Sequence, residues 1–202
     1  MPAATVLIVP GYNGSGPDHW QTRWQAERRD CRRVEQARWN DPDPNGWCTA
    51  LAAHAAAAEP PVIIVAHSLG CATVAHWVAR GGNIAGIAGA LLVAPCDVER
   101  PGLPDCITRF APMPRVALPF RSTVVASSND SYATLERARA FASDWGSAFV
   151  NAGQIGHINA ASGLGNWPFG KVLLDTLIGT ASADRSPYVR AAALRSAAAP
   201  PP

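Results

Sequence analysis

The sequence lacks the features that mark disulfide-rich, metal-binding or membrane-spanning proteins. Its five cysteines are odd in number and none share a CxxC spacing, so neither a disulfide framework nor a zinc site is expected. No apolar run approaches the roughly 20 residues that a membrane-spanning helix needs. The first residues show no basic segment with an apolar stretch and a small-residue cleavage site. We therefore predict a protein with reduced thiols, without metal or membrane contact, in the cytoplasm.

The chain also has little net charge of either sign. Seventeen basic and 15 acidic residues give a formal net charge of +2, and charged residues make up only 16% of the chain. The densest basic stretch, residues 28–33, is interrupted by Asp30 and is interpreted as a solvated face. A nucleic-acid partner is therefore not expected. The 202 residues, 48% of them hydrophobic, suffice for one domain with its own core. The oligomeric state is left open.

Short apolar runs alternate with longer helix-like segments along the chain, which is typical of βαβ units and a parallel sheet. Residues 62–66 form a continuous apolar run, as expected of a central strand covered on both faces. We predict one doubly wound three-layer α/β/α domain over residues 1–180, with strand order 2-1-3-4-5-6. A loosely ordered tail is expected over residues 181–202. The expected strands are 5–9, 31–36, 62–66, 90–94, 123–126 and 148–151, and the expected helices are 21–29, 47–58, 69–80, 132–145 and 168–178.

The sharpest chemical signal is the segment Ala66-His67-Ser68-Leu69-Gly70, between the expected buried strand and its helix. A nucleophile elbow needs a strained turn there, which lifts a serine hydroxyl off the strand end. Gly70 lets strand and helix pass closely, whereas Ala66 stands where a glycine is more usual. The alternative for Ser68 is a helix cap, a frequent role for serine after a strand. The strand-before and helix-after context favours a nucleophile.

A serine hydroxyl attacks only when a base removes its proton, so a histidine must reach Ser68. Of the five histidines, His157 follows the last expected strand in a glycine-containing loop, and we predict that it is the base. His67 neighbours the serine but is expected to point away and pack. His54 and His76 lie in helical runs, as surface or satisfied core residues.

The third residue of such a site must accept a hydrogen bond from the other imidazole nitrogen. Asp130 follows the strand 123–126 at the carboxyl edge of the sheet and is the predicted acid. Its structural alternative is an Asx turn or a cap to the following helix. Asp97, just past the previous strand, is the second candidate acid. The order Ser68, Asp130, His157 is the one expected of this fold.

Acyl transfer also needs two donors aimed at the oxyanion. We assign one to the backbone N–H of Leu69, and the other to the N–H of Tyr12, with Asn13 as the alternative. Asn13 and His19, near the expected mouth, are the candidate substrate-binding residues. The glycine-rich loop 10–16 lacks the G-x-G-x-x-G spacing of a dinucleotide site, so no cofactor is predicted.

Four segments together resemble the retinoblastoma-binding protein 9-like and bacterial YdeN-like serine hydrolases of the α/β-hydrolase superfamily. They read VPGYNGSGPDHWQTRW, AHSLG, SSND and GHINAASGLGNWP, and span roughly residues 5–178. The resemblance implies a lidless or nearly lidless hydrolase of small carboxylic esters with Ser68, Asp130 and His157 as its triad. Members are also linked to protein binding. The tail after Thr180 lies outside the resemblance.

Two other functions compete with ester hydrolysis. A non-catalytic interaction protein would keep the fold and use its surface, with Trp20, Trp24 and Trp39 as candidates for an exposed patch, although packing in the core is the alternative use of these rings. An amidase or thioesterase would use the same triad, because the shape of the pocket decides which acyl compound is cleaved.

Overall fold

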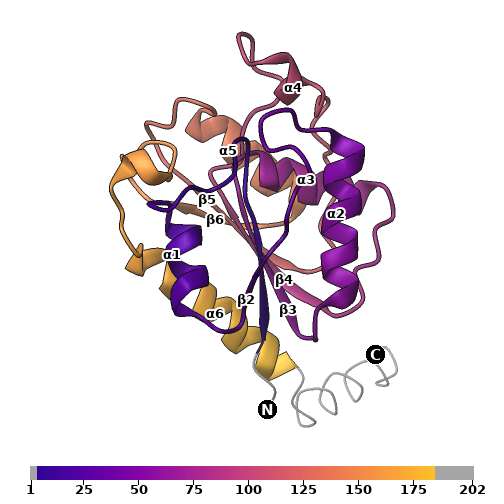
Figure 1. The fold of residues 1–202 in the computed structure, drawn as a ribbon. Helices are drawn as coiled ribbons and strands as arrows, with labels where there is room; N and C mark the ends of the chain where they lie inside the picture. Colours follow the sequence, from indigo (N-terminus) through magenta and orange to yellow (C-terminus); the bar gives the residue numbers. More distant parts are fainter. Residues whose placement is uncertain (1–3, 185–202) are drawn as a thin grey trace, which may run out of the picture.

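The computed structural model describes residues 4–184, which form a parallel sheet with helices on both faces (Figure 1). The strand order is β2-β1-β3-β4-β5-β6, and every neighbouring pair is parallel. This confirms the predicted doubly wound α/β/α fold and its strand order. The strands are β1 (Thr5–Val9), β2 (Cys31–Arg33), β3 (Val62–His67), β4 (Ile87–Val93), β5 (Arg121–Ala126) and β6 (Ala148–Asn151).

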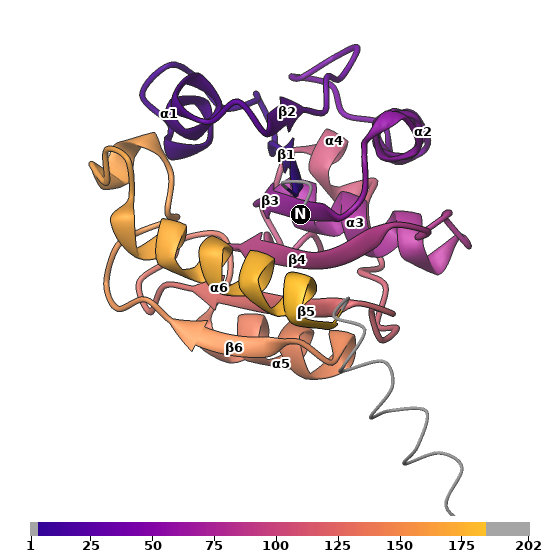
Figure 2. The same cartoon turned by 90° about the horizontal axis from the view of Figure 1, so that it is seen from below.

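Helices α1 and α6 cover one face of the sheet, and α2, α3 and α5 cover the other (Figure 2). The helices are α1 (Trp20–Glu27), α2 (Pro44–Ala57), α3 (Leu69–Ala79), α4 (Asp105–Thr108), α5 (Leu135–Trp145) and α6 (Pro168–Asp184), with a short 3₁₀ turn, η1, at Ala160–Ser162.

The two hydrophobic cores explain why β3 is apolar at every position. Ile64 and Ala66 belong to the core beneath α2, α3 and α5. Ile63 and Val65, one residue out of phase, belong to the core beneath α1 and α6. All four are fully buried. Because side chains alternate across a strand, both faces of β3 must be apolar, and its end at His67 therefore lies in the middle of the sheet.

Several element boundaries differ from the predicted ones because capping decides them. Helix α2 begins at Pro44 rather than residue 47, since the Asp43 carboxylate accepts from the Gly46 N–H (2.6 Å) and proline is tolerated in the first helical turn. Helix α5 begins at Leu135 rather than residue 132, because Thr134 is its N-cap. Helix α6 continues past residues 178 and 180 to Asp184. The rest of the predicted tail lies outside the described residues.

Within residues 4–184, no helix is long and apolar enough to cross a membrane. Between β4 and β5, the four-residue α4 is the regular element that the structure describes. All five cysteines are free in the structure.

Candidate active site

Ser68 lies between the end of β3 and the first turn of α3, with φ 54° and ψ −120°. Positive φ is uncommon for a residue other than glycine, so this turn is strained in the way a nucleophile elbow requires. The Ser68 hydroxyl makes no capping hydrogen bond to α3. Ser68 therefore occupies the N-cap position of α3 without capping the helix through its side chain, and its Oγ is available for chemistry.

Two glycines allow the elbow to pass close to the loop that follows β1. A Cβ added at Gly70 would lie 2.4 Å from the Val9 carbonyl oxygen, which no real side chain tolerates. A Cβ added at Gly11 would lie 2.9 Å from the Ser68 Cβ and 3.2 Å from the Leu69 nitrogen. The loop after β1 is thus brought directly beside the serine because both positions lack a side chain.

A chain of hydrogen bonds joins Ser68, His157 and Asp130. The His157 Nε2 lies 2.8 Å from the Ser68 Oγ, and its Nδ1 lies 2.9 and 2.8 Å from the two Asp130 carboxylate oxygens. The side chains of His157 and Asp130 are only 8% and 3% exposed. The structure therefore brings together all three residues predicted for the triad, from three separate strand ends.

Asp130 has both of the roles that its sequence position suggested. Besides contacting His157, its Oδ1 accepts a hydrogen bond from the Tyr132 N–H at 2.8 Å, which is an Asx turn. Asp97, the second candidate acid, instead pairs with the Arg137 guanidinium at 3.0 and 3.1 Å. Asp97 is therefore occupied by an ion pair, and the carboxylate that meets His157 is that of Asp130.

The segment before His157 is held by the loop that carries Asp130. The Ser127 Oγ accepts from the Ile155 N–H (3.0 Å), and the Asn129 Oδ1 accepts from the Gly156 N–H (2.8 Å). Sequence reasoning identified the SSND segment only through its aspartate. Its serine and asparagine link the two loops, so the acid and the base are fixed relative to each other.

The segment after His157 is held from the other side by two buried rings whose contacts with it were not predicted from the sequence. The His67 Nε2 lies 2.9 Å from the His157 carbonyl oxygen. The Trp20 Nε1–H donates to the next carbonyl, that of Ile158, at 2.8 Å. Burial lowers the pKa of His67 well below its usual range, so this ring donates as a neutral imidazole.

The backbone donors predicted for an oxyanion hole differ in availability. The Asn13 N–H donates to the Trp39 carbonyl at 2.9 Å, so it is already used. Among the hydrogen bonds of residues 4–184, the N–H groups of Tyr12 and Leu69 have no acceptor. Since Gly11 packs against the Leu69 nitrogen, these two donors lie on facing segments of the site.

His19 is buried rather than exposed at a pocket mouth, with 4% of its surface accessible. Its Nδ1 accepts from the Gln21 N–H (3.2 Å) and caps α1, and its ring packs against His67 with centroids 4.7 Å apart. Contact between His19 and a substrate stays a prediction, which this placement does not favour. Asn13 is exposed on the loop after β1.

Burial of His19 predicts acid sensitivity of the fold. Burial, with smaller contributions from Arg33 and His157, lowers the pKa of His19 from 6.5 to about 4. Between these pH values the unfolded chain takes up a proton that the folded chain refuses. The free energy of unfolding is therefore expected to fall by about 3 kcal/mol as pH drops from 6.5 to about 4.

Urea denaturation at a series of pH values measures this dependence. His19→Asn keeps a good helix cap and removes the titrating ring, so the curve should become flatter by about one proton. His67, whose pKa is lowered in the same direction, keeps part of the slope. An identical slope in the variant and the parent protein would contradict the assignment to His19.

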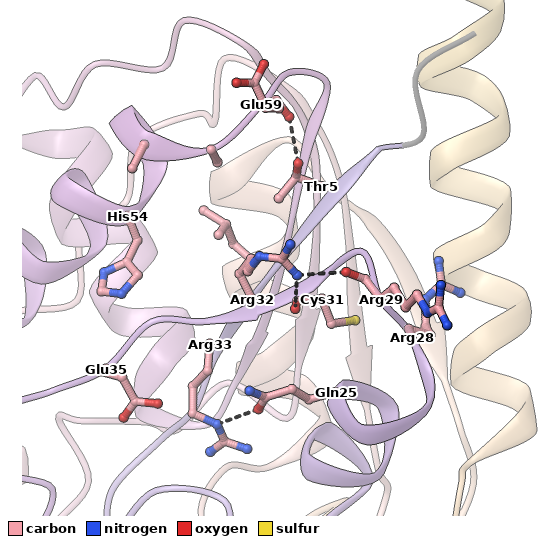
Figure 3. Close-up of a pocket in the computed structure, with 13 residues that line it drawn as sticks. Thr5, Gln25, Arg28, Arg29, Cys31, Arg32, Arg33, Glu35, His54 and Glu59 are labelled. Carbon is pink, nitrogen blue, oxygen red and sulfur yellow. Dashed lines mark hydrogen bonds between the residues drawn. The ribbon is translucent and has the colours of Figure 1, made fainter.

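Cavities lie both beside the triad and away from it. One of about 380 Å³ is bordered by Tyr132, His157 and parts of the loop 154–162. Another, of about 710 Å³, lies at edge strand β2, near the start of β1 and far from the strand ends that carry Ser68. Figure 3 shows that its labelled arginines do not converge on one point, and that Arg32 donates to backbone carbonyls instead. This second cavity offers no focused anion site.

Groups of histidine, cysteine and acidic side chains able to hold a metal ion are absent from residues 4–184. Thiol chemistry is also disfavoured near the serine. Burial raises the pKa of Cys96, three residues past the end of β4, to about 12, so this thiol stays protonated. The groups equipped for chemistry at this sheet edge are therefore the serine, the histidine and the aspartate.

The profile of the family described as "Serine hydrolase" matches residues 6–176, and the chain belongs to this family. Among solved structures, it is similar to a protein from Pectobacterium atrosepticum described as a YdeN-like hydrolase. The two share 31% sequence identity over 89% of this chain and 92% of the other, with a TM-score of 0.78. The resemblance to YdeN-like α/β hydrolases is thus confirmed.

More distant structures share the fold. The ydeN gene product of Bacillus subtilis has 18% identity and a TM-score of 0.70, over 88% of this chain and all of the other. Est1E from Butyrivibrio proteoclasticus, solved with ferulic acid bound, has 13% identity and a TM-score of 0.59, over 86% and 89% of the two chains. No curated protein sequence matches this chain.

Proposed function

We propose that the protein hydrolyses small carboxylic esters through an acyl-enzyme, with Ser68 as nucleophile, His157 as general base and acid, and Asp130 as the orienting carboxylate. The observation that carries this proposal is the continuous chain of contacts from Asp130 through His157 to the strained serine, with 2.8 Å between the His157 Nε2 and the Ser68 Oγ.

In the acylation step, the His157 Nε2 takes the proton of the Ser68 hydroxyl while the Oγ attacks the acyl carbon. The carbonyl oxygen becomes an oxyanion, stabilised by the N–H groups of Tyr12 and Leu69. Collapse of this intermediate breaks the acyl–oxygen bond, and His157 returns the proton to the leaving alkoxide. Water then repeats the sequence on the acyl-enzyme, releasing the carboxylic acid and regenerating the serine.

A cavity borders the base and could receive the leaving group. Because His157 gives its proton to the leaving oxygen, the alcohol portion of the ester must lie next to this ring. The cavity of about 380 Å³ bordered by His157 and Tyr132 is within the range of small-molecule sites. This supports a small-molecule substrate.

The three tryptophans considered for an exposed interaction patch are buried or partly buried. Trp20 and Trp24 are 1% and 0% exposed and lie in the core beneath α1 and α6. Trp39 is partly buried, with its ring centroid 5.8 Å from that of Trp47. These tryptophans therefore pack inside the protein, as the alternative use of the rings predicted.

A fluorophosphonate tests the proposal directly, because it reacts with an activated serine and not with a binding module. We expect one adduct per chain, mapped by mass spectrometry to the peptide that contains Ser68, with parallel loss of aryl-ester turnover. A panel of matched esters, thioesters and amides then identifies the preferred bond. A chain that remains unlabelled and turns over no acyl compound would overturn the proposal.

A further inference from the structure

The residue that precedes the nucleophile forms a hydrogen bond with the backbone of the base. His67 directly precedes Ser68 on β3, and its Nε2–H donates to the backbone carbonyl of His157 itself (2.9 Å). One hydrogen bond, from the side chain that directly precedes Ser68 to the backbone of His157, therefore links the two segments. Such a short path leaves little freedom for the imidazole to drift.

Trp20 provides a second bond of the same kind. Its indole N–H donates to the Ile158 carbonyl at 2.8 Å, and its ring lies edge-on to that of His67 with centroids 6.2 Å apart. Helix α1 is in turn tied to β3, because the Gln21 Nε2 donates to the Val65 carbonyl at 3.0 Å. Both donors thus connect the segment after His157 to β3, the strand that ends just before Ser68.

The segment held in this way is strained. Ile158 has φ 48° and is completely buried. A β-branched residue in the left-handed region is an outlier that persists only when its surroundings hold it. Without the two donors the chain after His157 would relax toward an ordinary conformation and carry the imidazole with it.

We propose that His67 and Trp20 are positioning residues, which hold the carbonyls of His157 and Ile158 and so keep the His157 imidazole in line with Ser68. This inference rests on the proposed triad. Neither residue touches the reacting atoms. They act on the base through its backbone, so their loss should lower kcat and leave KM almost unchanged.

Two amide substitutions at one position isolate the hydrogen bond. In His67→Gln the amide nitrogen is as many bonds from Cβ as the histidine Nε2, so it can still reach the His157 carbonyl. In His67→Asn it is one bond shorter and cannot. We expect the Gln variant to keep kcat within about 3-fold of the parent and the Asn variant to lose about 10²-fold, the scale of an error of about 1 Å in placement.

Helix α1 supplies a matched pair for the indole. Trp24 is also buried and donates to a backbone carbonyl in the same region at 2.8 Å, but its acceptor is Asn166, several residues beyond His157. Trp20→Phe and Trp24→Phe both remove one indole N–H bond from one helix. We expect both to lower the melting temperature and only Trp20→Phe to lower kcat, by about 10-fold or more.

A signal independent of turnover separates this proposal from the proposed function. The low-field proton resonance of the His157 Nδ1–H reports the ring's contact with Asp130, and it should shift in His67→Asn and Trp20→Phe but not in His67→Gln or Trp24→Phe. The positioning roles are wrong if His67→Asn matches His67→Gln, and Trp20→Phe matches Trp24→Phe, in kcat and in an unshifted resonance. This outcome would count against them even if the parent protein is an active esterase. If the parent protein is inactive, the resonances alone decide.

Discussion

Ser68→Ala is expected to lower kcat for an aryl ester by about 10⁶-fold while the protein stays folded. The hydroxyl that forms the acyl-enzyme is lost, whereas the turn that carries it loses only one oxygen atom. Because the Ser68 hydroxyl caps no helix, the variant sacrifices no backbone hydrogen bond. Steady-state kinetics, with circular dichroism for the fold and fluorophosphonate labelling for the nucleophile, measures the effect.

Ser128→Ala is the matched control for this substitution. Ser128 is exposed on the loop that leads to Asp130, at the same edge of the sheet. Its loss should leave both turnover and labelling near the parent level. If Ser68→Ala still becomes labelled at the parental rate, another residue is the nucleophile and the assignment of the elbow is wrong.

Asp130→Asn is expected to lower kcat by about 10⁴-fold. The Asp130 carboxylate accepts a hydrogen bond from the His157 Nδ1–H, which keeps the proton on Nδ1 and leaves the Nε2 free to act as a base. An asparagine amide can present its N–H₂ group to the Nδ1 instead, which favours the opposite tautomer. The asparagine oxygen can still accept from the Tyr132 N–H, so the Asx turn and the fold are retained.

Asp97→Asn tests the other candidate acid under the same conditions. This change breaks the ion pair with Arg137 and should cost stability, with kcat within about 2-fold of the parent value. A melting curve and the pH dependence of kcat for both variants separate the two effects. If Asp97→Asn loses more activity than Asp130→Asn, Asp97 and not Asp130 is the acid.

The sequence contains most of what defines the sheet and the triad. Apolar runs with no polar alternation identify central strands, and polar residues just past such runs must meet at one edge of a parallel sheet. Ser68 directly follows such a run, whereas Asp130 and His157 lie four and six residues past the ends of β5 and β6. The ends of helices were less predictable, because they depend on single caps such as Asp43, whose carboxylate extends α2 beyond its apolar pattern.

The groups that hold the site in place could not be predicted in this way. His67 and Trp20 look like core residues in sequence, since an aromatic ring beside apolar neighbours gives no sign of which carbonyl it faces. Their acceptors lie 90 and 138 residues away along the chain. The SSND segment offered a weak signal, because a serine and an asparagine at a strand end are suited to bind the backbone of a neighbouring loop.

The long-range bonds of α1 also dictate when the site can form during synthesis. Trp20 and Trp24 leave the ribosome early, but their carbonyl partners follow 138 and 142 residues later. Until then both indole N–H groups lack these partners, and the strained segment at Ile158 does not exist. A nascent chain can pair β1 with β3 before that point, but the base reaches the serine only after residues 157 and 158 have been made. Assembly of this hydrolase therefore ends, rather than begins, at its reacting centre.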